Sequence, residues 1–198
     1  MAKGHGLGGR GFSLIEFMVT VTLAALLLGL ATPSFLTWTR NAQVRTVTDS
    51  LQNGLRMAQA EAVRRQRQVV FFLTENAACD LANTASANGR FWVIRTVPLL
   101  DGEGAQVVQC GALADVAAGT TITGPTALCF GSAGRLVANA TPGAGAGVQC
   151  LPGNLNRYDV TRIGADRALR VTVSLGGQTR LCDPARTLTD AQPDGCPA

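Results

Sequence analysis

The feature that most constrains this chain is an uncharged stretch of 23 residues, 17–39, bounded by Glu16 and Arg40. A helix needs about 20 apolar residues to cross the hydrocarbon core of a bilayer, so the stretch has the length of one crossing. A secretory signal peptide has a shorter apolar core, followed by a small-x-small cleavage site. Residues 31–35, at the far end of this stretch, instead read ATPSF. The sequence therefore predicts a retained, single-pass membrane helix.

A carboxylate, Glu16, stands at the head of this stretch. A charge in a membrane helix costs about 2.5–3.5 kcal/mol at the bilayer centre and less near an end, so Glu16 is a functional candidate with a positive charge as its expected partner. Cleavage between Gly11 and Phe12 would create that charge, the α-amino group of Phe12. This group would lie one helical turn before Glu16, in the same chain or in a packed neighbour. Residues 1–11 would then be a removable leader whose basic residues stay on the cytoplasmic side. A plain signal anchor is the alternative, but it leaves Glu16 unexplained.

Residues 11–16, which read GFSLIE, resemble the processing site of type IV prepilins and type II secretion pseudopilins. The resemblance implies that a prepilin peptidase cuts between Gly11 and Phe12 and methylates the new amino terminus at Phe12. It also implies that Glu16 brings subunits into register during assembly, and that Pro33 falls where helices of this family commonly have a proline. The implied partners are other minor and major pilins or pseudopilins, the prepilin peptidase and the inner-membrane assembly platform.

Beyond the leader, the chain lacks residue types on which much enzyme chemistry depends. Lys3 and His5 are its only lysine and histidine. Without residues 1–11 there would be no Ser-His or Cys-His nucleophile pair, no histidine metal ligand and no Schiff-base lysine. The remaining 15 arginines (17 basic residues minus Lys3 and Arg10) and 13 acids leave a charge of about +2, without the excess of a dedicated nucleic-acid binder. We expect no enzyme, no cofactor and no metal site.

Six cysteines follow the membrane stretch, and an even number suits structural disulfides in an oxidising compartment. None belongs to a C-x-x-C motif, which disfavours zinc and redox sites. The connectivity stays open, because six cysteines allow 15 pairings. The pairing that we favour joins Cys182 to Cys196, Cys129 to Cys150 and Cys79 to Cys110. Closing the loop between Cys182 and Cys196 would stabilise the fold by roughly 3 kcal/mol in the chain-entropy model.

The rest of the pattern predicts an α+β fold, in which one long helix carries an antiparallel, two-sheet head. Apolar residues at spacings of three and four continue the helix over 40–66. We expect the head to cover this stripe, which consists of Val44, Val47, Leu51, Leu55, Ala58 and Ala62. The strand candidates are 68–74, 90–97, 106–110, 120–123, 127–130, 135–138, 157–162, 169–175 and 178–182. The segment 139–154 is expected to be a mobile surface loop, and Gly176-Gly177 a two-residue hairpin turn.

These patterns divide the chain into four parts. Residues 1–11 form the leader, 12–39 the transmembrane and assembly helix, 40–66 an amphipathic helix, and 67–198 a periplasmic head stabilised by disulfides. We expect the chain to reside in the bacterial inner membrane with its head in the periplasm, before it enters a pilus or pseudopilus.

Three further motifs narrow the resemblance to the GspH/FimT group of type IV pilin-like proteins. They are MAQAEAVRR at 57–65, FGSAGR at 130–135, and G-x-x-R-x-C-D-P at 177–184. The group implies a low-copy subunit at or near the fibre tip. The hypothesis that we favour is a minor type IV pilin of the FimU or FimT kind that helps to prime pilus assembly. The alternative is a minor pseudopilin of the GspH kind in a type II secretion system.

A third, less favoured hypothesis is a minor pilin that binds DNA for uptake. Some FimT-like proteins bind DNA through basic residues on the final hairpin, and here Arg170, Arg180 and Arg186 are the candidate contacts. Arginines can anchor phosphates with a salt-sensitive affinity. However, Gln178 and Cys182 occupy two of the places where the DNA-binding pattern has basic residues, which favours a solvated strand face instead.

Overall fold

The computed structural model describes residues 13–100, 102–113, 119–153 and 156–197. The chain forms two compact units, which meet between Thr37 and Trp38. One helix, α1 (Leu14–Arg65), contributes its first part to the N-terminal unit and its second part to the head.

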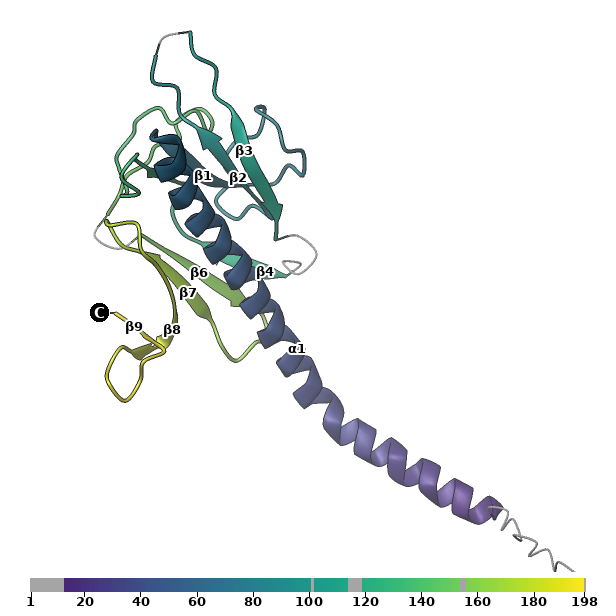
Figure 1. The fold of residues 1–198 in the computed structure, drawn as a ribbon. Helices are drawn as coiled ribbons and strands as arrows, with labels where there is room; N and C mark the ends of the chain where they lie inside the picture. Colours follow the sequence, from purple (N-terminus) through teal and green to yellow (C-terminus); the bar gives the residue numbers. More distant parts are fainter. Residues whose placement is uncertain (1–12, 101, 114–118, 154–155, 198) are drawn as a thin grey trace, which may run out of the picture. The chain divides into compact units, whose positions relative to one another are not determined.

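The head contains two sheets, shown with the helix in Figure 1. Their strands are β1 (Val69–Thr74), β2 (Phe91–Thr96), β3 (Val107–Ala112), β4 (Thr120–Thr123), β5 (Ala127–Phe130), β6 (Asn156–Arg162), β7 (Leu169–Val173), β8 (Thr179–Thr187) and β9 (Gly195–Cys196). The first sheet has the order β3-β2-β1-β5 and the second the order β4-β6-β7-β8-β9. Neighbouring strands are antiparallel except β8 and β9, which are parallel. The expected α+β fold with a two-sheet head is confirmed, with one parallel pair at the end of the second sheet.

The second part of α1 packs on both sheets through its apolar stripe. All six residues of the predicted stripe are buried, and they share one core with residues of both sheets, among them Phe71 of β1 and Tyr158 of β6. The spacing of three and four residues places these side chains on one face of the helix, so a single surface of the head covers them. This contact joins the helix to the head.

The first sheet is buried on its other face as well, which corrects the expectation for 139–154. Val70, Phe72 and Cys129 on that face form a second core with Ala144 and Cys150. The segment therefore covers a sheet face and does not lie free on the surface. Its glycines and prolines indicate an irregular backbone but carry no information about what that backbone covers.

Two expectations for turns and strands also change. The β7–β8 connection is a three-residue loop rather than a two-residue turn, because Ser174 N donates to Gln178 O at 3.0 Å and Gly177 N donates to Ser174 O at 2.8 Å. Gly177 has a φ of 84°, the conformation expected of the last residue in such a loop.

Residues 135–138 do not form a strand of either sheet. Leu136 N donates to Leu175 O beyond β7, while Val137 N donates to Cys129 O of β5. Successive amides of this segment therefore bond to different partners, the β7–β8 loop and β5, and the segment does not extend either sheet.

Candidate functional site

The N-terminal candidate site begins just before the helix. Gly11 and Phe12, the residues of the predicted processing site, lie outside the described residues. At the start of the helix, Phe17 N donates a hydrogen bond to Ser13 O at 3.1 Å. Glu16 lies in the first turn of α1, where the partial positive charge of the helix terminus favours a carboxylate. Glu16 is therefore compatible with the start of a helix as well as with an external partner.

The first part of α1 has an apolar surface on all its sides. Among the residues whose burial is described, its large apolar side chains are exposed at neighbouring positions and form no single buried stripe. They are Leu14, Ile15, Phe17, Met18, Val19, Val21, Leu23, Leu26, Leu27, Leu28, Phe35 and Leu36. Within this surface the hydroxyl groups of Thr20 and Thr22 donate to helix carbonyls, those of Phe17 at 2.9 Å and Met18 at 2.7 Å. These hydroxyls therefore need no partner outside the helix.

By length and composition, no single helix of the described residues is long and apolar enough to cross a membrane. The segments Leu14–Gly29 and Ser34–Arg65 of α1 meet that requirement only as a pair. Pro33, the predicted family proline, lies between these two segments.

The six cysteines form three disulfides, with the pairing favoured from the sequence. Cys79 joins Cys110, Cys129 joins Cys150, and Cys182 joins Cys196. The first bond ties the β1–β2 connection to β3. The second ties the segment 139–150 to β5, and the third ties β9 to β8. Two disulfides thus link strands of the first sheet to connecting segments, and the third links two strands of the second sheet.

The three candidate DNA contacts all have acceptors within the head. Arg170 Nε lies 2.6 Å from Asp159 Oδ1 on the neighbouring strand β6. Arg180 Nη2 donates to Pro193 O at 2.7 Å, and Arg186 Nη1 donates to Asp194 Oδ2 at 2.8 Å. A phosphate group would have to compete with these contacts, which join neighbouring strands and hold the C-terminal loop on β8.

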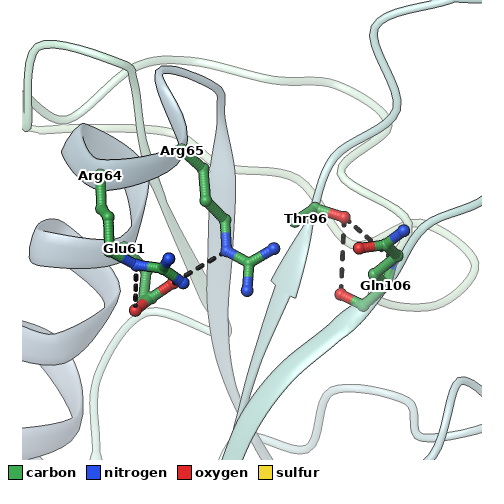
Figure 2. A network of polar contacts seen from close by, with 5 residues as sticks. All are labelled: Glu61, Arg64, Arg65, Thr96 and Gln106. Atoms are coloured by element: carbon green, nitrogen blue, oxygen red, sulfur yellow. Dashed lines mark hydrogen bonds and ion pairs between the residues drawn. The ribbon is translucent and has the colours of Figure 1, made fainter.

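The end of α1 carries a compact ion cluster, shown in Figure 2. Glu61 accepts hydrogen bonds from Arg64 Nη2 at 2.6 Å and from Arg65 Nε at 2.8 Å. The hydrogen bonds from Arg64 and Arg65 lower the pKa of Glu61 to about 2. Both arginines lie in the last turn, where cations complement the helix dipole. This cluster stabilises the end of the helix and belongs to the architecture of the head.

Sequence reasoning missed Arg95, a buried arginine of β2. Its guanidinium donates to Gly143 O at 2.6 Å and to Asn83 O at 3.0 Å, and it lies 5.2 Å from the ring centre of Phe72. Burial lowers the pKa of Arg95. These contacts hold the segments around Asn83 and Gly143 over the first sheet. The available signal was a charged residue that follows four consecutive apolar residues in the strand sequence FWVIRT.

Sequence reasoning also missed a junction at the β7–β8 loop. Gln59 Nε2 donates to Gly134 O at 3.0 Å, and a Cβ at Gly177 would collide with that carbonyl oxygen and lie 2.5 Å from Gln59 Nε2. Gly134 and Gly177, which belong to the motifs at 130–135 and 177–184, thus both pack against Gln59 of α1. Among the described residues, no group of three or more His, Cys, Asp or Glu side chains could hold a metal ion.

Comparisons with known proteins agree with this architecture. The family described as type II transport protein GspH matches residues 47–177. Among solved structures, the type IV minor pilin FimU of Pseudomonas aeruginosa (strain PAO1) is similar with a TM-score of 0.51 and 18% identity, over 74% of this chain and 96% of that chain. The minor pseudopilin EpsH of the Vibrio cholerae type 2 secretion system gives a TM-score of 0.43 and 16% identity, over 74% of this chain and 99% of that chain. No curated protein matches the chain.

The likeness to FimU shows the fold, a type IV pilin-like helix and head. FimU is a minor pilin and EpsH a minor pseudopilin. The family match covers 131 of the 198 residues and includes the stripe of α1 from Val47 onwards, the strands before β8, and the Gly134–Gly177 junction. The chain therefore belongs to the GspH family of pilin-like proteins.

Proposed function

We propose that the chain is a minor type IV pilin that is stored in the inner membrane and helps to prime pilus assembly at or near the fibre tip. The observation that carries this proposal is the first part of α1, whose exposed apolar side chains surround the helix and whose first turn holds Glu16. Among the described residues, this apolar surface is mostly exposed. Lipid covers it before assembly, and the helices of neighbouring subunits replace the lipid afterwards.

Cleavage by prepilin peptidase after Gly11 adds a positive charge, the new amino terminus at Phe12, to the negative charge of Glu16. The new methylated amino group of Phe12 in one subunit pairs with Glu16 of its neighbour. Because both groups enter an apolar environment, an unpaired carboxylate there would cost free energy, and the pair sets the register between subunits. The mechanism is physical and involves no chemical conversion after processing.

The C-terminal part of the head inclines the proposal towards a pilus. Residues 178–198 lie beyond the range matched by the GspH family. They contain the Cys182–Cys196 disulfide, and strand β9 extends the second sheet there. This closed extension offers a surface for other minor pilins. The alternative function is a minor pseudopilin of a type II secretion system, which the description of the matched family favours.

The first test is the intact mass of the membrane-extracted protein, before and after reduction. We expect a mature chain that starts at methylated Phe12 and is lighter by six hydrogens before reduction, as three disulfides require. A chain that keeps its leader in cells with active prepilin peptidase would contradict the proposal and leave a signal anchor.

The second test separates assembly from folding. Glu16→Ala should leave processing and the head intact but prevent incorporation into sheared fibres. Glu75→Ala, which removes an exposed acid of the head, is the matched control and should assemble normally. In a strain that lacks this gene, lost surface pili with normal secretion support the minor pilin. Lost secretion with normal pili would assign the chain to a pseudopilus.

A further inference from the structure

The turn between β6 and β7 exposes an isoleucine next to residues that are hydrogen-bonded to α1. Ile163 is 93% exposed, while Ala165 of the same turn packs against the core. Single exposed apolar residues are common on protein surfaces and usually need no explanation. The contacts of this turn with α1 distinguish Ile163 from the other exposed residues of the head.

The turn is tied to the first residues of α1 that follow the uncharged stretch. Arg40 Nη1 donates to Gly164 O at 3.4 Å, and Asn41 Oδ1 accepts hydrogen bonds from Asp166 N at 3.0 Å and Arg167 N at 3.3 Å. Thr39 ends the stretch, and the Cα atoms of Arg40 and Asn41 lie about 1.5 and 3 Å beyond that of Thr39 along the helix axis. When Thr39 lies at the edge of a bilayer, the turn that contacts Arg40 and Asn41 therefore lies close to the same edge.

A groove beside this turn has the chemistry of a membrane interface. It has a volume of about 260 Å³ and is lined by Trp38, Arg45 and Arg167, among others. Tryptophan is enriched at headgroup level in membrane proteins, and guanidinium groups match phosphate oxygens in geometry and charge.

Acidic side chains near the groove leave its arginines available. Asp49 Oδ2 lies 3.9 Å from Arg45 Nε, and the Arg45 side chain remains 74% exposed. Along α1, Asp49 is four residues further from Thr39 than Arg45 is. A membrane surface near Thr39 would therefore contact Arg45 before Asp49. Asp183 Oδ2 lies 3.8 Å from Arg167 Nη2, also at the outer limit of an ion pair. Asp166 is on the turn itself, and its amide is bound to Asn41.

We propose that Trp38, Arg45, Ile163 and Arg167 form a membrane foot, which seats the head on the phosphate layer of an anionic phospholipid bilayer before assembly. Ile163 enters the headgroup layer, and the two arginines bind lipid phosphates. The inference rests on the proposed function only in that the uncharged stretch lies in the membrane. The foot adds a second, salt-sensitive attachment that the subunit must release when it enters a fibre.

The test uses the full mature chain in lipid nanodiscs whose acyl chains are brominated close to the headgroups. Ile163→Trp places a fluorescent reporter in the foot, and Leu151→Trp places one at another exposed position of the head. After subtraction of the signal of the parent, which contains Trp38 and Trp92, we expect strong quenching at 163 in phosphatidylglycerol. Quenching should be weaker there in phosphatidylcholine and absent at 151 in both. Equal quenching at 163 and 151, or at 163 in both lipids, would overturn the proposal.

The charge of the foot is tested in the Ile163→Trp background. Arg45→Gln should reduce the ratio of seated to free heads about fivefold, since one arginine near an anionic surface contributes about that factor. Arg135→Gln, at an exposed arginine of the β5–β6 connection, is the matched control and should change little. Inorganic phosphate should release the head no better than chloride at equal ionic strength. A specific effect of phosphate would indicate a site for the free ion and contradict a lipid surface.

The same samples separate this inference from the proposed function. Quenching of Trp38 is measured as the difference between the parent and Trp38→Phe, and it reports whether the end of the stretch lies in the bilayer. If Trp38 is quenched and the reporter at 163 is not, the foot is wrong and the membrane anchor stands. If neither is quenched, the membrane anchor itself fails.

Discussion

The two parts of α1 have the same secondary structure and opposite relations to the rest of the chain. Before Thr37 the described large apolar side chains are mostly exposed on several sides of the helix, whereas after Trp38 the six apolar residues of the stripe lie on one face that the head buries. The difference follows from the pattern of apolar residues, because a stripe can be covered by one surface but an apolar helix must be surrounded. The stripe of the second part is thus covered by residues of the head, whereas the apolar side chains of the first part stay exposed.

Leu51→Ala should give the largest loss of stability and tests this difference directly. Leu51 is fully buried between the sheets, and removal of a buried leucine side chain costs about 2–5 kcal/mol because a cavity remains. The free energy of unfolding of the head, measured by urea denaturation with the disulfides intact, should fall by that amount. Leu27→Ala, at an exposed leucine of the first part, is the control. A similar loss in both variants would mean that the head also depends on the first part of the helix.

The second prediction concerns the covalent closure of the head. The double variant Cys182→Ala/Cys196→Ala should lower the free energy of unfolding by about 3 kcal/mol, as expected for a separation of 14 residues. Urea denaturation of the variant and the parent measures this loss.

The contacts of Arg180 with Pro193 and of Arg186 with Asp194 hold the same loop. They would remain in the double variant. An unchanged free energy of unfolding would mean that these polar contacts, and not the disulfide, close the loop.

Gly177→Ala should destabilise the head by about 2 kcal/mol. An alanine there combines an unfavourable left-handed backbone, which costs about 1–2 kcal/mol, with a collision against Gly134 O and Gln59 Nε2. The hairpin loop should move away from α1, and hydrogen exchange at residues 174–178 should become faster.

Two other glycines are matched controls for this variant. Gly176→Ala places its Cβ 3.6 Å from Ser174 Oγ, an ordinary contact, and Gly29→Ala in the first part of α1 meets nothing within 4 Å. Neither should destabilise the head, and Gly29→Ala should favour the helix by about 0.5–1 kcal/mol. Equal losses at 176 and 177 would remove the argument for a specific junction.

Much of this architecture could be predicted from local patterns. The stripe from Val44 to Ala62 and the strands from β1 to β7 follow from periodicity and β propensity, because burial of one face dictates which residue types recur. The three disulfide pairings join cysteines that are neighbours in sequence order. The assembly role of Glu16 stays a prediction, made because a carboxylate beside a long apolar stretch is costly enough to require a reason.

The remaining features depend on contacts between distant segments. The cover over the first sheet needs the donation from Arg95 to Gly143, 48 residues away, and the hairpin loop needs Gly134 and Gln59 to pack against Gly177. No local pattern encodes such partners. The extension of β8 beyond Cys182 was missed for a similar reason. Pro184 disfavours a strand in isolation, but β9 and its disulfide hold residues 183–187 in place.

The smallest effect is expected from acid, and it concerns the far end of α1. The pKa of Glu61 is lowered to about 2 by its hydrogen bonds with Arg64 and Arg65. A carboxyl group whose pKa is lower in the folded state stabilises the fold above its unfolded pKa of about 4.3, and this contribution is lost as the pH falls towards 2. Its side chain is 19% exposed and Arg64 is more exposed still, so solvent screening limits the contribution to about 1 kcal/mol.

Urea denaturation of the parent and of Glu61→Gln between pH 6 and pH 2 measures this contribution. Glu61→Gln should be less stable at pH 6, and the difference from the parent should shrink as the pH falls, because the parent loses the same charge by protonation. Glu75→Gln is the control, since its carboxylate lies 3.3 Å from Arg90 but is about half exposed. A difference between Glu61→Gln and the parent that does not depend on pH would show that packing rather than charge accounts for the role of Glu61. In that case the end of α1 would not be stabilised by its ion pairs.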